Sequence, residues 1–303
     1  MIIGHNRVLN FLKRSAEKKK TAHAYLFTGP THLGKRTVAL EFIKALVGHE
    51  MEKVVHPDVL IIEPEITEKD DIKKESAISI SQARAVQHQM NMFPYQADYK
   101  ITLIDQAERM NLEAANCLLK TLEEPSGQAI LILITANPQM LLPTIISRCQ
   151  VVNFLPVAEE EIKKAFPKAK EQIIRLANGR PGLVINYLEN PELLEEQNKI
   201  INKLEELLKA DLNQRYQYAE EISKNVPEAR QILNHWIFWF RDLLLLSNDC
   251  PDLVVNKNIS KYHKSYSSTK LKSIIETIKN TNWLLANPSI NARLALEVLM
   301  LEI

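Results

Sequence analysis

The sequence predicts an α/β domain with a parallel sheet, followed by helical segments that continue to the C-terminus. Short apolar runs rich in β-branched residues alternate with helical patterns in the first half of the chain. That alternation is typical of β-α-β units and therefore of a parallel sheet. The runs are almost continuously apolar, as expected for strands buried on both faces. The strand signals stop after Pro156, so the remainder is expected to be all-α.

Five segments carry the strand signal, at 24–29, 59–64, 100–105, 129–136 and 151–154. Helices are expected between them at 35–47, 80–91 and 112–122. Ser79 stands three residues before Gln82, which is the spacing of a capping box. Asn111 is a favourable N-cap for the helix that follows it. The segment 63–75 is expected to be an exposed loop because charged residues dominate it.

The second half of the chain reads as helix throughout. Three short helical patterns lie at 157–166, 171–178 and 182–189, and longer ones lie at 191–210, 227–248, 268–286 and 289–303. The apolar stretch 235–246 fits either a membrane or partner surface or a buried helix. Its length, below the ~20 residues that span a bilayer, and its Arg241–Asp242 pair favour the buried helix. We therefore expect three domains, at 1–155, 156–193 and 194–303.

Composition places the chain among ordinary globular proteins, with 46% apolar and 25% charged residues. The net charge of +1 neither demands nor excludes nucleic acid. The three cysteines are far apart and form no CxxC pair, which excludes a disulfide framework and predicts a reducing cytoplasm. The N-terminal segment lacks the apolar core of a signal peptide.

The segment 29–37, GPTHLGKRT, follows one expected strand and opens one expected helix. Gly29, Gly34 and Lys35 have the spacing of a P-loop, in which backbone N–H groups and a lysine hold phosphates at a helix N-terminus. A chance glycine-lysine turn is the alternative interpretation. The order of strand, loop and helix favours the P-loop.

One position of this P-loop departs from the pattern. The residue after the lysine is Arg36, where a Ser or Thr hydroxyl would hold Mg²⁺. Thr37 comes one residue later, and one helical step turns it by about 100° away from the metal position. Phosphate binding is left open by this change. Metal-assisted hydrolysis is expected to suffer.

Two further strand ends carry candidate site residues. Asp105 ends an expected strand, as the aspartate that orients Mg²⁺ does in P-loop proteins, although a simple strand-end cap is the alternative. Gln106 follows it, and a glutamine cannot act as a base toward water. Glu108 is expected on the following loop or helix. Thr135 ends another buried strand, where a sensor residue would face a γ-phosphate.

Ser147, Arg148 and Cys149 are candidate catalytic residues, and they stand just before the last expected strand. A lone arginine there would ordinarily be a solvated surface charge. The sequence around it gives it more weight, because several segments together resemble one protein family. These segments are HAYLFTGP, HPDVLIIEP, ISISQARAVQHQM, ITLIDQAERMNLEAANCLLKTLEEPSG, ANPQMLLPTIISRC and NARLALEVLML.

The family they resemble is the clamp-loader branch of the AAA+ ATPases, and within it the delta-prime subunits of bacterial DNA polymerase III. This resemblance implies that Arg148 is an arginine finger, which reaches the ATP site of a neighbouring subunit in a ring. It implies a small helical lid at 156–193 and a collar at 194–303 through which subunits assemble. The implied partners are the gamma/tau ATPase subunits and the delta subunit in a hetero-pentamer, with the sliding clamp and primed DNA contacted indirectly.

Three positions differ from the ATPase members of that family. Arg36 replaces the metal-binding hydroxyl, Gln106 the catalytic glutamate, and Gly182 a sensor arginine. These differences favour a non-hydrolysing subunit over the alternative, an active gamma/tau-type ATPase. An AAA+ adaptor outside replication is a third hypothesis. Binding of ATP or ADP is left open.

A zinc module present in many relatives is expected to be missing. The stretch ALVGHEMEKVVHPD contains no cysteine, so we expect no zinc. Its two histidines, His49 and His56, are expected at the surface.

Overall fold

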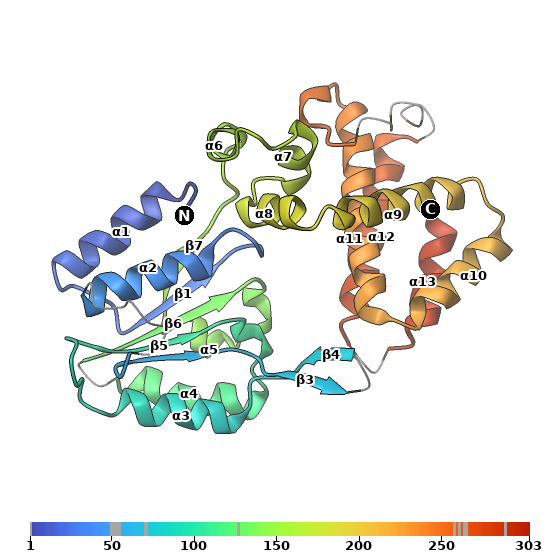
Figure 1. The fold of residues 1–303 in the computed structure, drawn as a ribbon. Coiled ribbons are helices and arrows are strands. Elements are labelled where there is room, and N and C mark those ends of the chain that lie inside the picture. The colour runs from blue at the N-terminus through green and yellow to red at the C-terminus, as the bar shows by residue number, and fades with distance from the viewer. Residues whose placement is uncertain are drawn as a thin grey trace. The chain divides into compact units, whose positions relative to one another are not determined.

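The computed structural model describes residues 2–48, 56–69, 72–125, 128–256, 259, 262, 266–287 and 290–303. The chain divides into two compact units, Met1–Asn186 and Tyr187–Ile303. Figure 1 shows a sheet with helices on both faces in the first unit and helices alone in the second. The expected fold class, α/β followed by all-α, is confirmed. The further division at residue 156 stays a prediction.

The main sheet of the first unit has five parallel strands in the order β2-β5-β6-β1-β7. All five coincide with expected strands, and they are β1 (Ala24–Thr28), β2 (Val59–Ile62), β5 (Lys100–Ile104), β6 (Ala129–Thr135) and β7 (Gln150–Asn153). Thr28 is in register with Thr135. Since parallel strands present their carboxyl ends at one edge, the segments after β1, β5 and β6 meet there.

Helices cover both faces of this sheet (Figure 1). α1 (Asn6–Glu17) and α2 (Lys35–Val47) pack on one face, and α3 (Ile80–Met90) and α4 (Leu112–Glu123) pack on the other. Alternate residues of β6 serve the two cores, so that Ile130 and Ile132 point to α2 while Leu131 and Leu133 point to α3 and α4. Burial on both faces accounts for the unbroken apolar sequence of the strands.

The expected helix caps are present. The Ser79 side chain accepts from the backbone N–H of Gln82, and the Gln82 side chain accepts from the Ser79 N–H at 2.9 Å, which completes the capping box. Asn111 Oδ1 accepts from the Ala114 N–H at 2.7 Å. These bonds satisfy N–H groups that the first helical turn leaves without a partner.

The segment 63–75 is not the loop that its charge suggested. β3 (Ile66–Lys69) and β4 (Ile72–Glu75) pair antiparallel, with Ile66 opposite Glu75 and Lys69 opposite Ile72. Charged side chains do not prevent backbone N–H and carbonyl groups from pairing across two strands. Charge content alone therefore gave the wrong structure for this segment.

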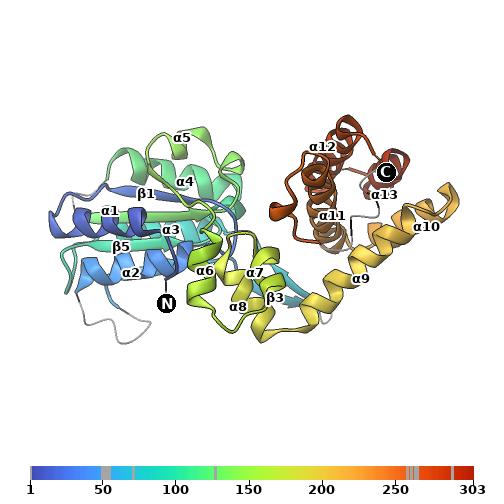
Figure 2. The same cartoon turned by 90° about the horizontal axis from the view of Figure 1, so that it is seen from above.

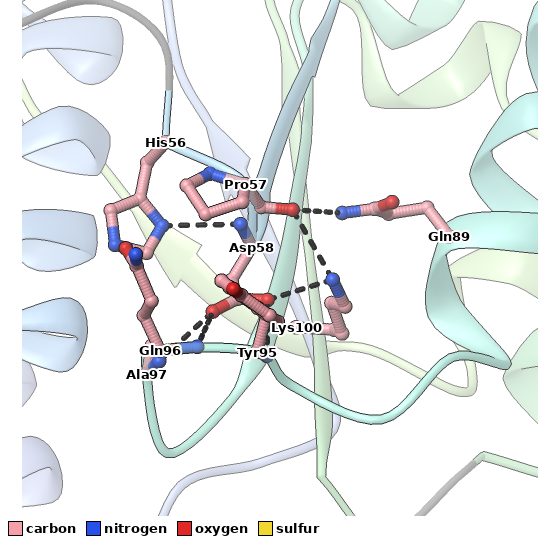
Figure 3. A network of polar contacts seen from close by, with 8 residues as sticks. All are labelled: His56, Pro57, Asp58, Gln89, Tyr95, Gln96, Ala97 and Lys100. Atoms are coloured by element: carbon pink, nitrogen blue, oxygen red, sulfur yellow. Dashed lines mark hydrogen bonds and ion pairs between the residues drawn. The ribbon is translucent and has the colours of Figure 1, made fainter.

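A buried ion pair fixes the connection between α3 and β5 (Figure 3). Asp58 is fully buried beside β2, and its Oδ1 lies 2.7 Å from Lys100 Nζ. Its carboxylate also accepts the backbone N–H groups of Tyr95, Gln96 and Ala97 at 2.7, 2.7 and 2.9 Å. Burial acts to raise the pKa of Asp58, but the Lys100 hydrogen bond and the three N–H donors outweigh it and lower that pKa well below its usual range.

His56 was expected at the surface, and this prediction is wrong. Its side chain is only 9% exposed, and its Nδ1 accepts from the Asp58 N–H at 3.1 Å. Nearby, Lys100 Nζ and Gln89 Nε2 both donate to the Pro57 carbonyl, at 3.2 and 3.3 Å. The histidine thus helps to hold the turn into β2, a role that a single sequence does not reveal. The other histidine of that expectation, His49, lies outside the described residues.

Short helices complete the first unit. α5 (Pro143–Ile146) precedes β7, and the three expected short helices follow it as α6 (Glu159–Ala165), α7 (Glu171–Ala177) and α8 (Pro181–Glu189). The Val157 N–H donates to the Gly179 carbonyl at 2.8 Å. This bond ties the chain leaving β7 to the turn before α8.

The second unit is built from α9 (Glu192–Leu207), α10 (Leu212–Ser223), α11 (Val226–Leu246), α12 (Ser268–Leu284) and α13 (Ala292–Glu302). Trp236, Trp239 and Phe240 are fully buried in its core, so the apolar stretch 235–246 is a buried helix as expected. α11 and α12 run side by side (Figure 2). α10 was not among the separate helical segments identified from the sequence, since its polar sequence has few apolar positions. None of the helices in the described ranges combines the length and apolar character that a bilayer-spanning segment requires.

Candidate functional site

A cavity of about 550 Å³ lies at the carboxyl edge of the parallel sheet. Its walls come from the loop after β1, the start of α2, the ends of β5 and β6, and the start of α8. The lining residues are Thr31, His32, Gly34, Lys35, Arg36, Asp105, Gln106, Glu108, Ile134, Thr135, Ala136 and Gly182. The topology thus brings together most of the candidate residues that were identified from separate motifs.

The P-loop residues stand where their backbone geometry requires glycine. A Cβ on Gly29, whose φ is +138°, would lie 2.4 Å from the Phe154 carbonyl oxygen. Gly34 is the N-cap of α2 with a φ of +86°, and a Cβ there would meet nothing within 4 Å. Lys35 Nζ donates to the carbonyls of Gly29 and Pro30, the latter at 2.7 Å. Burial lowers the pKa of Lys35, against the opposing charges of the nearby carboxylates.

Arg36 is paired with two carboxylates. Its Nη1 donates to Glu63 Oε2 at 2.5 Å and to Asp105 Oδ2 at 3.3 Å. Burial acts to lower the pKa of Arg36, but the hydrogen bond and charge of Glu63, followed by those of Asp105, raise it above its usual value. Asp105 Oδ1 accepts from the Gln106 N–H at 2.9 Å, so both oxygens of this carboxylate have partners.

The residues present do not fit a magnesium ion of the usual P-loop kind. Position 36 offers a guanidinium in place of a hydroxyl, and that cation already lies against Asp105, the expected metal ligand. Thr37 is exposed on α2 and is not part of the cavity lining. Over the described ranges, the structure holds no group of three or more His, Cys, Asp or Glu residues that could bind a metal.

The ends of β5 and β6 shape the inner wall of the cavity. Gln106 adopts a left-handed conformation with a φ of +50°, which starts the short 3₁₀ turn Ala107–Arg109. Within that turn, Glu108 Oε1 accepts from the Ala136 N–H at 3.1 Å, while its Oε2 is buried without a hydrogen-bond partner in the described structure. Thr135 Oγ1 accepts from the Asn137 N–H at 3.0 Å. Sequence reasoning did not assign Glu108 to the cavity, because its place depends on the turn.

Gly182 closes the cavity from the side of α8. Its N–H donates to the His32 carbonyl at 2.9 Å, and a Cβ on Gly182 would lie 2.9 Å from that same oxygen. A larger residue there would therefore have to displace the P-loop. Burial, followed by the charges of Arg180 and Lys35, lowers the pKa of the His32 ring.

Arg148 is not among the residues that line the cavity. It follows α5, where its Nη2 donates to Glu123 Oε1 at 2.8 Å and its Nη1 donates to the Thr144 carbonyl at 3.0 Å. Its side chain is 35% exposed. Ser147 Oγ donates to the same Thr144 carbonyl at 3.1 Å, and burial raises the pKa of the Cys149 thiol to about 12. A thiol with that pKa is not an active nucleophile at neutral pH.

Comparison with known proteins identifies the family of this chain. A family model described as "DNA polymerase III, delta subunit" matches residues 4–158. The DNA polymerase III subunit delta' of Pseudomonas aeruginosa is 33% identical over 214 residues, which cover 63% of this chain and 63% of that protein. The subunit delta' of Bacillus subtilis is 28% identical over 297 residues, covering 90% of this chain and 86% of that protein.

A tau subunit of DNA polymerase III is also similar to this chain. The DNA polymerase III subunit tau of Bacillus subtilis is 28% identical over 278 residues, covering 80% of this chain and 49% of that protein. This chain therefore spans less than two thirds of the Pseudomonas and tau relatives and most of the Bacillus delta' relative. The matched family model covers the whole parallel sheet and the P-loop. The chain belongs to the DNA polymerase III delta-subunit family of clamp-loader proteins.

Proposed function

We propose that this chain is a delta-prime-type subunit of a DNA polymerase III clamp loader, acting as a non-hydrolysing stator. It assembles with gamma/tau ATPase subunits and a delta subunit in a cytoplasmic hetero-pentamer. It supplies Arg148 to the ATP site of a neighbouring subunit during ATP-driven loading of the sliding clamp onto primed DNA.

The pairing of Arg36 with Asp105 and Glu63 is the observation that carries this proposal. A Mg²⁺ ion neutralises the charge that develops during phosphoryl transfer. In this cavity the Arg36 guanidinium is paired with Asp105, the carboxylate that would otherwise orient Mg²⁺. Gln106 adds a second loss, since its amide cannot take a proton from an attacking water. Losses of this general-base kind cost about 10²-fold or more. The cavity is therefore unsuited to hydrolysis.

The position of Arg148 supports its proposed action on a neighbour. The side chain is outside the chain's own cavity, partly exposed, and held by Glu123 at the end of α4. An arginine presented in this way is preorganised, because Nη2 is anchored on Glu123 and Nη1 on the Thr144 carbonyl, while further N–H donors of the guanidinium remain for a phosphate. Ser147 and Cys149 contribute to the turn that carries it and take no part in the chemistry we propose.

The outward face of α13 supports assembly through the collar. Leu296, Leu299 and Met300 are buried in the core of the second unit. On the other face, Leu294, Val298 and Leu301 are 58%, 53% and 57% exposed. Residues spaced by four and three positions lie on one side of a helix, so these three form a continuous apolar stripe. We call Leu294, Val298 and Leu301 the α13 stripe, and propose that it packs against another subunit.

An active gamma/tau-type ATPase is the alternative function, and the similarity to the Bacillus tau subunit over 80% of this chain favours it. The Arg36 pairing and the close contact of Gly182 with the P-loop argue against it.

ATP turnover by the purified chain distinguishes the two functions. The stator predicts no turnover above that of Lys35→Ala, whereas turnover at a rate typical of AAA+ motors, abolished by Lys35→Ala, would show the active ATPase. The same preparation is then mixed with gamma/tau and delta subunits. Failure to co-purify with them would reject the clamp-loader assignment.

A further inference from the structure

One tryptophan of the second unit lies at its surface. Trp283, near the end of α12, is 77% exposed, whereas Trp236 and Trp239 are fully buried in the core. The indole of Trp283 therefore contributes little to the packing of the helices. A single exposed apolar residue is ordinary at a protein surface, so the groups around the ring decide what it can bind.

Two cations stand at the same end of α12. Lys279 precedes Trp283 by one helical turn, is exposed, and makes no ion pair within the described ranges. Arg230, near the start of α11, is also exposed. Its Nε donates to Oδ1 of Asn282, the residue before Trp283, at 2.9 Å. The start of α11 thus lies against the end of α12 that carries the ring.

The guanidinium of Arg230 is held in a fixed position. Asn282 Nδ2 donates to Asn234 Oδ1 at 2.8 Å, which turns the amide oxygen of Asn282 toward Arg230. In the part of the chain that the structure describes, Nη1 and Nη2 of Arg230 have no partner. The N–H donors on these two nitrogens remain for a further acceptor. A phosphate matches the planar fork that they form.

Neither cation is neutralised by a carboxylate. No Asp or Glu occurs in residues 277–296, which contain four asparagines. The nearest acid before Trp283 on α12 is Glu276, two turns away. On α11, Glu228 stands close to Arg230 in sequence, and its Oε2 accepts from Asn225 Nδ2 at 2.9 Å. The positive charge of this surface complements the phosphates of a nucleic acid.

This surface differs in kind from the α13 stripe. The stripe is aliphatic, which suits packing against another protein. An exposed aromatic ring with cations beside it suits single-stranded nucleic acid, because a base stacks on the ring while phosphates bind the cations. The bases of a duplex are already stacked on one another, so their faces are not available to the ring.

We propose that Trp283, Lys279 and Arg230 bind single-stranded nucleic acid, with one base stacked on the indole and neighbouring phosphates bound by the two cations. We call these three residues the Trp283 surface. Stacking accepts any base, so binding is expected to be insensitive to sequence. The inference goes beyond the proposed function, since it requires neither the action of Arg148 nor the state of the P-loop cavity.

Fluorescence anisotropy of a labelled oligothymidylate of about ten nucleotides, titrated with the full-length chain at low salt, tests this. Trp283→Ala should raise the Kd by about fivefold or more, the effect of losing one base–aromatic stack. Trp283→Phe keeps an aromatic face and should bind more tightly than Trp283→Ala. Phe93→Ala removes an 87% exposed ring from the first unit and is the matched control, with an unchanged Kd.

The salt dependence of binding reports on the cations. For single strands, the slope of log Kobs against log salt is about −0.7 for each phosphate contacted. Arg230→Gln should therefore reduce the slope by about 0.7. Lys199→Gln removes an exposed lysine from α9 and should leave the slope unchanged. Melting curves check that each variant is folded, as expected for substitutions of exposed side chains.

Three results would overturn the inference: no binding of the oligothymidylate by wild type, a wild-type Kd in Trp283→Ala, or equal affinity for a single strand and for a duplex of the same length. If Trp283→Ala binds the oligothymidylate as wild type does but no longer co-purifies with the other loader subunits, the ring belongs to a protein interface instead. None of these results bears on the stator, which rests on Arg36 and Arg148.

Discussion

Arg148 Nη2 donates to Glu123 Oε1 across 2.8 Å, which joins the turn before β7 to the end of α4 over a separation of 25 residues. The two side chains are 35% and 50% exposed, so the contact lies at the surface of the first unit. An exposed ion pair of this kind contributes little to folding, about 0–1 kcal/mol. Its value lies in fixing the direction of the guanidinium.

Glu123→Gln should therefore loosen Arg148 without removing it. We expect the reconstituted loader to assemble normally and to turn over ATP up to about fivefold more slowly, the ratio that corresponds to 1 kcal/mol. Glu124→Gln, at the exposed neighbouring position, is the matched control and should have no effect. A loss of turnover in Glu123→Gln that persists when Arg148 is already alanine would exclude action through Arg148.

Asp58→Asn should destabilise the first unit by about 3–5 kcal/mol, because it leaves Lys100 buried without its counter-charge. The measurement is the free energy of unfolding from denaturant titration at pH 7. Asp98→Asn breaks the exposed pair with Lys19, also 2.7 Å long, and should cost less than about 1 kcal/mol. Equal losses of unfolding free energy from the two substitutions would show that burial does not make the Asp58–Lys100 pair matter more than the exposed one.

The same pair gives a pH dependence with a definite sign. The pKa of Asp58 is lowered in the folded chain, so its contribution is complete above the unfolded value of about 3.9 and is lost as the pH falls toward the lowered pKa. The stability difference between wild type and Asp58→Asn should therefore shrink below about pH 4. A stability difference that stays constant between pH 7 and pH 3 would contradict a lowered pKa of Asp58 in the folded chain.

Gly182→Ala should destabilise the first unit by collision, since its Cβ would lie 2.9 Å from the His32 carbonyl oxygen. Overpacking of this kind costs about 1–3 kcal/mol. Gly34→Ala should also destabilise, but by backbone strain at a φ of +86° with open space around it. Asparagine tolerates that conformation, so Gly34→Asn should recover stability where Gly182→Asn loses more. Chemical denaturation of the four variants checks the contrast.

Local patterns predicted the elements of this fold well. The parallel strands follow from apolar runs, and the caps at Ser79 and Asn111 follow from side chains that bond within three residues. The segment 63–75 and α10 were missed because their sequences are polar, and polarity says little about backbone pairing or about which helices cover a core.

The site was predictable only in part. The P-loop and the strand ends were identified because their spacing is local or because parallel strands share an edge. Glu63 was not identified as a site residue, because its contact with Arg36 spans 27 residues and depends on where β2 ends. Glu123 and His56 were missed for the same reason. Contacts between distant segments are set by the packing of whole elements, which one sequence does not encode in any short pattern.

The α13 stripe should be needed for assembly and not for folding. Replacing Leu294, Val298 and Leu301 together by serine is expected to leave the melting temperature within a few degrees of wild type, because these side chains are already more than half exposed. Co-purification with the other loader subunits should be lost. Leu212→Ser, at a 50% exposed position of α10, is the control. Intact assembly of the triple variant would place the interface elsewhere.

Arg148 is proposed to act on a neighbouring subunit, and clamp-dependent ATP turnover by the reconstituted loader measures that action. Wild type, Arg148→Ala and Arg148→Lys are compared at matched assembly, with clamp and primed DNA present. An arginine finger supplied in trans raises kcat by roughly 10³–10⁵-fold in GTPases. The loss of turnover should be smaller in a ring whose other sites continue to hydrolyse ATP. We predict at least about a tenfold loss for Arg148→Ala, with little recovery in Arg148→Lys because lysine lacks the planar fork. Turnover and clamp loading by Arg148→Ala at the wild-type rate would contradict the claim.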